Sequence, residues 1–514
     1  MITTSTIAAV AMAASMGSAI VVQDQTSLRA APRDSAQQQS SLWQGEVLEV
    51  RGERLDYLQV WDHKRERGGF IRASDVRRVA LTEAEGPALL AVLRFVQNTP
   101  GAEALGIGLT AAYLQAAPAQ VLAGAEGAQA LDALGTLADR LARRASPAVA
   151  GKTQGATLSA HLDVANGYGV RFTSYEVDGR MQVCYDGDAF RRVLAMPAAT
   201  AEQRARAALA LTRPECINPD LPPPERASLN VWQADVLERV DVARLPGYLR
   251  NRVQMRRASV WSATAFQQAR KNVSDPSVAA SAARALTEFA GVSKTELPDD
   301  DQPIYNDTAM RVSAVRWALV RADVPPVVAT ATAATTLTTA TKSTRLATPA
   351  AAAGMQPTVT TVPGAPGETC VLLVDAKNDG TTPLLRRCTY GVVWLASART
   401  NREGTAVVLA VQPMEGWREL WVMRKTPGGW LADVLPPAAT TPETGVAEWA
   451  GWVPGGRQIL VAREARGQGR YRKSFEVVRL DDLTTERVTG DVSALPLFQR
   501  WQDPAWKQQT LSLR

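Results

Sequence analysis

The chain contains 514 residues, a length that predicts three or four domains of ordinary size. A hydrophobic fraction of 46% and a charged fraction of 21% are those of a soluble globular protein with buried cores. The net charge is +6. The basic residues are 48 arginines and only 9 lysines, and they are spread along the whole sequence. Such a modest and dispersed charge supports weak contact with an anionic membrane surface, and it predicts no nucleic-acid partner.

The first nineteen residues have the composition of a secretory signal peptide. An apolar run leads to Gly17-Ser18-Ala19, small residues of the kind that signal peptidase accepts. No basic residue precedes this run, since the first one is Arg29. Two alternatives therefore stay open: a true start further upstream, or a frayed apolar N-terminus on a cytoplasmic protein. We predict a signal peptide at residues 1–19 and a periplasmic or secreted location.

Residues 20–80 alternate between short apolar runs and turn-forming segments, which predicts a small all-β barrel. In order and spacing these runs resemble the bacterial SH3 (SH3b) family. The matching segments are Ser27–Pro32, Leu42–Val50, Tyr57–Val60 and Gly68–Val76. A polar insert at 37–41 and a charged loop at 62–67 depart from the family pattern. The resemblance implies a module that binds cell-wall peptides, and hence peptidoglycan, or protein partners.

Four aromatic residues of this SH3-like region are candidates for a binding groove: Trp43, Tyr57, Trp61 and Phe70. Large aromatic rings offer both apolar area and stacking surfaces to a ligand. The alternative is that several of them fill the core of the small barrel. We keep all four as candidate binding residues.

Residues 83–321 change to a helical period. Leu89, Val92 and Val96 fall on one helix face, and similar patterns recur up to Val320, separated by prolines. A two-stranded interruption is expected at 170–185. Because no fixed repeat length is present, we predict an α-helical bundle or irregular solenoid with a small β-hairpin.

Part of this helical region is strongly basic. Residues 242–272 contain seven Arg or Lys and no Asp or Glu. Arg250, Arg256 and Arg257 are candidates for a basic face that docks anionic lipid or cell-wall polymer. The alternative is a solvated helix face that is partly paired with Glu296 and Asp299–Asp301.

Residues 322–369 are dominated by Ala, Thr, Pro and Val, which predicts an extended linker. Residues 370–514 return to β periodicity and hold eight of the thirteen tryptophans. Two related units begin at Gly391 and Gly445. The segment Trp452–Leu460 resembles the strand-turn-strand step of periplasmic TolB-like propeller repeats. Since so few units cannot close a propeller, we predict a β-sandwich or a partial propeller.

All four cysteines are predicted to form disulfides. Cys370 and Cys388 are equally distant from the Asp379-Gly380 turn signal, so they would face each other across an antiparallel pair. Cys184 and Cys216 lack such a local argument, although an even count suits a second bridge. The alternative is buried free thiols. Disulfides agree with an oxidising compartment and therefore with export.

No catalytic constellation stands out in the sequence. Histidines occur only at 63 and 161, and the sequence contains no His-Glu-x-x-His, Cys-x-x-Cys or Gly-x-Ser-x-Gly pattern. We therefore predict no metal site and no cofactor. Acidic pairs or runs that leave a hydrolase open are Asp186/Asp188, Asp299–Asp301 and Asp481/Asp482.

The expected architecture is multidomain: a small SH3-like β-barrel (20–80), a mostly α-helical domain (83–321), a linker (322–369) and a β-rich domain (370–514). The leading hypothesis is a non-enzymatic exported envelope protein that binds a cell-wall peptide or an envelope protein through the SH3-like module. The competing hypothesis is a glycosidase-like envelope hydrolase. Two carboxylates roughly 5–10 Å apart in a cleft would favour hydrolysis.

Overall fold

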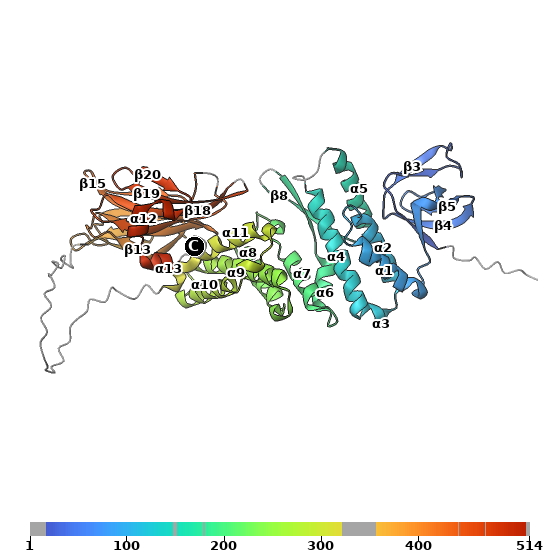
Figure 1. Ribbon diagram of the computed structural model, residues 1–514, viewed down its shortest axis with the longest axis horizontal. Coiled ribbons are helices and arrows are strands. Elements are labelled where there is room, and N and C mark those ends of the chain that lie inside the picture. The colour runs from blue at the N-terminus through green and yellow to red at the C-terminus, as the bar shows by residue number, and fades with distance from the viewer. Residues whose placement is uncertain are drawn as a thin grey trace, which may run out of the picture. The chain divides into compact units, whose positions relative to one another are not determined.

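A computed structural model of the chain describes residues 17–146, 152–177, 180–320, 356–439, 442–467 and 469–509 (Figure 1). Along the sequence an antiparallel β region is followed by helices and then by a β-rich region, as predicted. The chain divides into two compact units. The N-terminal unit comprises the residues up to Pro222 together with Asp235–Leu245, and the C-terminal unit comprises Pro223–Ala234 and the residues from Pro246 onward. The boundary falls within helix α8 (Pro223–Glu238).

The N-terminal unit begins with a seven-stranded antiparallel sheet of strand order β3-β2-β6-β5-β4-β1-β7. Its strands are β1 (Ser18–Val21), β2 (Thr26–Arg29), β3 (Gln38–Leu42), β4 (Val47–Arg54), β5 (Tyr57–Asp62), β6 (Arg67–Arg72) and β7 (Val76–Val79). Alternate residues such as Leu58, Val60 and Ile71 point into one apolar core. Among the described strands β3 pairs only with β2, and β7 only with β1, so this sheet is not closed into the predicted barrel.

Strand β1 lies inside this sheet, between β4 and β7. Ser18 pairs with Glu49 on one side and with Val79 on the other, and Ala19 is completely buried. Most of the predicted signal peptide, residues 1–16, lies outside the described residues. Cleavage after Ala19 would remove the first two residues of β1. The signal peptide therefore stays a prediction, and its proposed cleavage point conflicts with the sheet.

Seven helices of the N-terminal unit follow the sheet: α1 (Gly86–Val96), α2 (Glu103–Ala116), α3 (Ala119–Leu122), α4 (Ala125–Ala145), α5 (Lys152–Gly167), α6 (Asp188–Ala195) and α7 (Ala201–Leu211). The predicted hairpin is present as β8 (Phe172–Val177) and β9 (Arg180–Tyr185). Helix α4 packs against α2, α5, α6 and α7, because alanine and glycine on its buried face let neighbours approach closely. Within the described part of the chain, no helix is long and apolar enough to cross a membrane.

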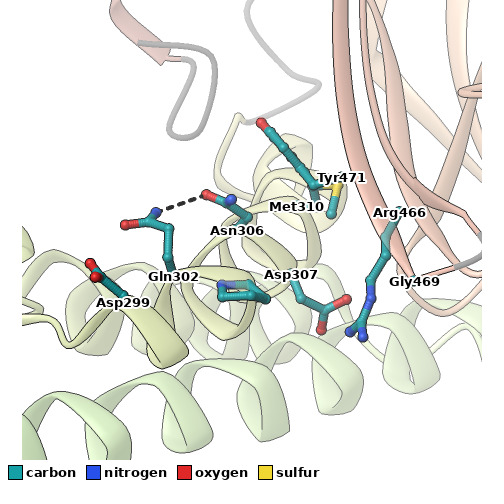
Figure 2. Close-up of a pocket in the computed structure, with 9 residues that line it drawn as sticks. Asp299, Gln302, Asn306, Asp307, Met310, Arg466, Gly469 and Tyr471 are labelled. Carbon is teal, nitrogen blue, oxygen red and sulfur yellow. Dashed lines mark hydrogen bonds between the residues drawn. The ribbon is translucent and has the colours of Figure 1, made fainter.

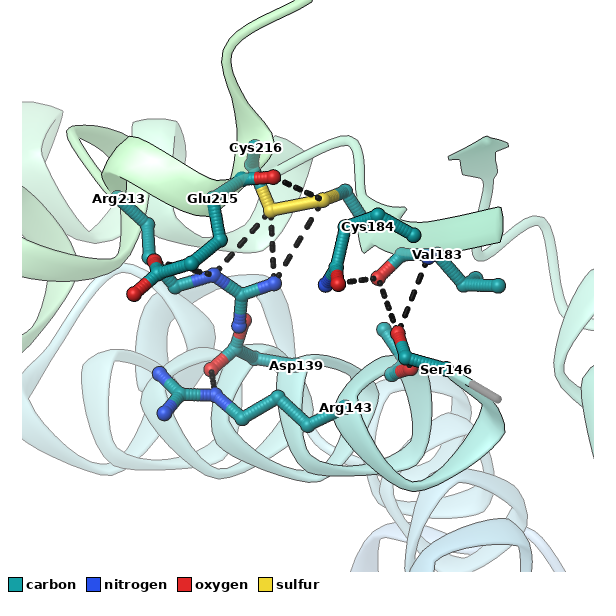
Figure 3. Close-up of a disulfide and its surroundings, with 10 residues drawn as sticks. Asp139, Arg143, Ser146, Val183, Cys184, Arg213, Glu215 and Cys216 are labelled. Atoms are coloured by element: carbon teal, nitrogen blue, oxygen red, sulfur yellow. Dashed lines mark hydrogen bonds and ion pairs between the residues drawn. A yellow bond between two sulfur atoms is a disulfide. The ribbon is translucent and has the colours of Figure 1, made fainter. Parts of the chain in front are cut away.

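Both predicted disulfides are present. Cys370 and Cys388 are register partners on neighbouring strands, as the turn signal predicts. Cys184 of β9 is bonded to Cys216 of the short helix η3 (Pro214–Cys216), as Figure 3 shows. The buried Arg213 donates hydrogen bonds to the sulfur of Cys216 at 2.7 and 3.2 Å, and it pairs with Asp139 of α4. This bridge and ion pair fasten η3 to both the hairpin and α4.

The C-terminal unit opens with three long helices: α9 (Gly247–Arg270), α10 (Asp275–Ala290) and α11 (Gln302–Val315). The short helix η7 (Arg316–Leu319) follows α11 and packs its Trp317 against Trp394 of the β-rich region. The predicted helical domain (83–321) is divided between the two compact units, and α9, α10 and α11 share a core with the C-terminal sheets. Of the predicted linker (322–369), residues 322–355 lie outside the described residues, and residues 358–363 form a paired strand.

The β-rich region consists of a three-stranded and an eight-stranded sheet, followed by two short helices. The first sheet contains β10 (Thr358–Pro363), β11 (Thr369–Val374) and β12 (Leu385–Thr389). The second contains β13 (Val392–Thr400), β14 (Ala406–Met414), β15 (Trp417–Thr426), β16 (Gly429–Leu435), β17 (Thr444–Val453), β18 (Gln458–Gly467), β19 (Arg470–Arg479) and β20 (Thr485–Thr489). The helices are α12 (Pro496–Trp501) and α13 (Pro504–Gln509).

The eight-stranded sheet contains the two sequence repeats as two four-stranded antiparallel groups, β13–β16 and β17–β20. They join through a short parallel pairing of β15 with β17. Val407 and Leu409 of β14 pack against the β10–β12 sheet, whereas Val408 packs against the β17–β20 group. Leu460 of β18 faces α12 and α13. The strand groups therefore stack face to face, and the two helices cover the last group (Figure 1).

Candidate functional site

Three of the four aromatic candidates lie on one face of the N-terminal sheet. Tyr57 and Trp61 of β5 alternate with residues of the apolar core, so their rings point to the opposite face. Phe70 of β6 stands directly opposite Gln59 and therefore shares this face. Tyr57 is buried, whereas Trp61 and Phe70 are partly exposed. We call Tyr57, Trp61 and Phe70 the aromatic face.

A carboxylate holds the Tyr57 end of the aromatic face in place. Asp34 accepts hydrogen bonds from the Tyr57 hydroxyl and from the Arg72 guanidinium. The hydrogen bond from Arg72, followed by the one from Tyr57, lowers the pKa of Asp34 to about 2. The same contact with Asp34 raises the pKa of the Tyr57 hydroxyl. Asp34 is therefore ionised at neutral pH while Tyr57 keeps its proton.

An arginine stacks on Trp61 at the other end. The guanidinium carbon of Arg51 lies 4.4 Å from the centroid of the Trp61 ring, which is a cation–π distance. Glu49 accepts a hydrogen bond from Arg51 at 3.1 Å and lies 2.7 Å from His63. The hydrogen bond from Arg51 holds the pKa of Glu49 below its usual value. The exposed part of the face therefore combines two aromatic rings with an arginine that is paired with a glutamate.

Trp43 does not belong to the aromatic face. It follows β3 and meets His161 of α5 edge-on, with ring centroids 6.4 Å apart. The Nε2 atom of the buried His161 lies 2.8 Å from a carboxylate oxygen of Asp24. The prediction of one groove lined by all four aromatics is therefore wrong for Trp43, which packs where the sheet meets the helices of its own unit.

The predicted basic face on α9 is not a free surface. Arg257 is only 7% exposed and lies 3.7 Å from the carboxylate of Glu288. Arg250 donates to Glu296 at 2.8 Å, and Arg256 is also engaged. Docking of lipid or cell-wall polymer on these three arginines therefore stays a prediction, and Arg250 and Arg257 already have acidic partners. The alternative is supported, because acidic residues of the following segment pair with this helix.

The predicted carboxylate pairs do not form one site. They lie in separate segments: Asp186 and Asp188 before and in α6, Asp299–Asp301 before α11, and Asp481 and Asp482 after β19. Asp301 is buried against Arg252, with oxygens 2.8 and 3.0 Å from its Nε. Asp481 pairs with Arg479, whose hydrogen bond lowers the pKa of Asp481 to about 2. Asp301 and Asp481 therefore act as local ion-pair partners.

The cysteines hold neither a nucleophile nor a metal ligand. Glu368, Cys370 and Cys388 place ligand-type atoms within 4.8 Å of one another. Both of these sulfurs are joined in a disulfide, however, and a metal would need the thiolates. The remaining two cysteines form the other bridge.

Two features were missed by sequence reasoning. The first is a buried ionic cluster in the C-terminal unit, in which Glu448 accepts hydrogen bonds from Arg316, Arg418 and the Trp506 indole. The three donors lie 30 to 132 residues from Glu448 in the sequence, so no local spacing indicates the cluster. The second is a cavity beside α11. In this cavity one face of α11 lies against Arg466, Gly469 and Tyr471, which come more than 150 residues later in the chain.

The geometry thus yields one aromatic surface outside the core of the N-terminal sheet, one polar cavity in the C-terminal unit and two disulfides. The two disulfides indicate an oxidising, extracytoplasmic location. No family model, no curated protein and no solved structure matches this chain.

Proposed function

We propose that this protein is an exported, non-enzymatic binding protein whose N-terminal SH3-like sheet binds a cell-wall peptide or an envelope protein. The observation that carries the proposal is the aromatic face, where Trp61 and Phe70 are partly exposed although they are not needed in the core. Partly exposed aromatic rings beside fixed polar groups are typical of surfaces that bind peptides and proteins.

The charge around this face favours recognition of a peptide over attraction to a polyanion. Residues 17–79 contain ten basic and nine acidic side chains, and many of them are paired with one another. Arg51 and Arg72 are tied to Glu49 and Asp34, respectively. A ligand is therefore selected by ring contacts and hydrogen bonds, and its binding should depend weakly on salt.

The competing hypothesis of a hydrolase has less support. A paired-carboxylate mechanism needs one acid that keeps its proton near neutral pH. Asp307, a carboxylate in the cavity beside α11, is instead held below its usual pKa. Burial alone would raise that pKa, but the positive charge and hydrogen bond of Arg311 outweigh it. The lowered pKa keeps Asp307 ionised, so Asp307 does not supply the proton-donating acid of such a mechanism.

Co-sedimentation of the full-length protein with purified peptidoglycan sacculi across a salt series tests the proposal. We expect the wild-type protein to be retained on sacculi to an extent that changes little with salt. The substitutions Trp61→Ala and Phe70→Ala should each weaken this retention. Phe95→Ala is a matched control, since Phe95 is a strongly exposed ring on α1 of the same unit. Equal retention of all three variants would show that the aromatic face is not the binding surface.

Absence of retention at every salt concentration would overturn wall binding. Crosslinking in the native envelope then decides whether a protein is bound instead. We expect the wild-type protein and Phe95→Ala to form the same crosslinked species, and Trp61→Ala to lose it. Crosslinking that does not depend on Trp61, together with no retention, would refute the proposed binding function.

A further inference from the structure

The C-terminal unit contains a cavity that no part of the proposed function uses. Its volume is about 240 Å³, and it lies between one face of α11 and the turn that joins β18 to β19 (Figure 2). Its lining residues are Asp299, Gln302, Pro303, Asn306, Asp307, Met310, Arg466, Gly469 and Tyr471. The helix residues recur at intervals of three and four, so they form one continuous wall.

Two amides on this wall are oriented by each other. Gln302 donates a hydrogen bond to the side-chain oxygen of Asn306 at 3.3 Å (Figure 2). This contact uses one N–H of Gln302 and orients the Asn306 amide. Within the described part of the chain, the Asn306 NH₂ group and the Gln302 carbonyl oxygen have no other side-chain partner. One donor and one acceptor group therefore remain for a ligand.

Arg311 holds a carboxylate beside these amides, that of Asp307, in place. Asp307 accepts a hydrogen bond from Arg311 at 2.8 Å, and Arg311 in turn donates to Glu415 at 2.9 Å. Burial raises the pKa of Asp307, but the charge of Arg311, together with Arg466 and a hydrogen bond from Thr444, brings it below the usual value. In Figure 2 the charged ends of Asp307 and Arg466 point toward each other. Asp307 is thus an ionised acceptor whose charge is largely balanced.

The opposite wall is aromatic. Tyr471 is partly exposed, and its hydroxyl donates a hydrogen bond to the buried Glu464. Burial, followed by the negative charge of Glu464, raises the pKa of Tyr471, so the hydroxyl keeps its proton. The ring is therefore held in position beside the cavity. Met310 adds a buried apolar side chain to the lining.

These groups define the chemistry of the ligand. Carboxylate and amide oxygens accept hydrogen bonds, whereas the Asn306 amide and the Arg466 guanidinium donate them. A small cation would meet Arg466, and a small anion would meet Asp299 and Asp307. A neutral ring with neighbouring hydroxyl groups matches both kinds of partner, because each hydroxyl donates and accepts. The volume is below the range of about 300–1,000 Å³ of drug-sized pockets, which suits a single ring.

We propose that this cavity binds one sugar ring of a neutral saccharide, with Asn306, Asp307 and Arg466 as its hydrogen-bonding residues and Tyr471 as the apolar wall. The inference goes beyond the proposed function, since the cavity lies in the C-terminal unit and the aromatic face lies in the N-terminal unit. Sugar binding by the cavity and ligand binding by the aromatic face can therefore be confirmed or refuted separately.

The test is saturation-transfer NMR on the full-length protein with N-acetylglucosamine and glucose as probes, and with cadaverine and inorganic phosphate as charged competitors. We expect saturable binding of at least one sugar and no displacement by either charged molecule. Asn306→Leu should weaken sugar binding at least about fivefold, as expected for one lost hydrogen bond. Asn166→Leu is the matched control, because Asn166 is an exposed residue of α5 in the other unit.

Arg466→Gln provides a second variant if Asn306→Leu fails to fold by circular dichroism, since Arg466 is an exposed residue near the end of β18. It should also weaken sugar binding, and Trp61→Ala should leave it unchanged. Failure of both sugars to bind, binding that both cavity variants retain, or displacement by cadaverine or phosphate would overturn the proposal. Each of these results leaves the sacculus experiment unaffected.

Discussion

Glu448 shows how a single residue connects three parts of the C-terminal unit. Its carboxylate is nearly inaccessible and accepts hydrogen bonds from Arg316 after α11, from Arg418 of β15 and from the indole N–H of Trp506 in α13. Burial raises the pKa of Glu448, but the two arginines outweigh it, and the pKa falls below the usual value. Burial also lowers the pKa of Arg418 to about 10, so Glu448 and Arg418 are both charged at neutral pH.

Glu448→Gln is expected to destabilise the C-terminal unit by about 3–5 kcal/mol, because both arginines would keep a buried charge without its counter-charge. The loss should be greatest at neutral pH. Since the pKa of Glu448 is lowered on folding, its contribution is complete above the ordinary value of 4.5 and disappears as the pH falls through the lower folded value. Urea unfolding of the wild type and the variant between pH 3 and pH 7 measures both effects.

Glu419→Gln is the matched control for this experiment, because Glu419 is a partly exposed glutamate on the same strand as Arg418. It should change the free energy of unfolding by less than about 0.5 kcal/mol at every pH. A Glu448→Gln variant as stable as this control would show that the buried cluster does not hold the helices to the sheet.

Among the secondary-structure elements, those with local signals could be predicted from the sequence. Asp379-Gly380 places Cys370 opposite Cys388, and the structure has them as register partners. The alternation of Tyr57 and Trp61 with core residues is also visible in the sequence of β5. Trp43 could not be placed, because it lies beyond the end of β3 and its neighbour His161 comes from a helix more than one hundred residues later.

The two disulfides offer a test at the level of elements, since each lies in a different unit. They close sequence separations of 32 and 18 residues, and loop-closure entropy gives each about 3–4 kcal/mol. We expect Cys184→Ser with Cys216→Ser to lower only the thermal transition of the N-terminal unit. Cys370→Ser with Cys388→Ser should lower only that of the C-terminal unit.

Differential scanning calorimetry of the two double variants measures these transitions. The wild type provides the reference temperatures for both units. If either double variant lowered both transitions by the same amount, the two units would unfold together, and the division of the chain into two units would have no thermodynamic counterpart.

In the whole molecule, composition and periodicity predicted four segments after the signal peptide, whereas the structure divides the chain into two compact units with a boundary inside α8. Helical periodicity shows that α9, α10 and α11 each have an apolar face, but it does not show what covers that face. In the structure Phe266 of α9 and Val278 of α10 pack with Val392 and Trp394 of β13. The aromatic face was predicted in part, whereas the cavity was not, because α11 meets a turn more than 150 residues later.

A cut in the segment between 321 and 355 should therefore not release two independent domains. We expect a protease site inserted between residues 340 and 350 to be cleaved while the two fragments remain together in size-exclusion chromatography. The reason is that Arg316 and Trp317 on one side are buried against the sheets on the other side. Urea should separate the fragments. Separation under native conditions would show that the shared core is too weak to hold them.

The buried contact between Arg316 and Glu448 also has a consequence for synthesis on the ribosome. The two residues are 132 positions apart, and translation proceeds at about 5–20 residues per second. Arg316 therefore leaves the ribosome on the order of ten seconds before its counter-charge exists. During this interval α9, α10 and α11 have an apolar face without a cover, so we expect the nascent chain to be prone to aggregation until β17 has emerged.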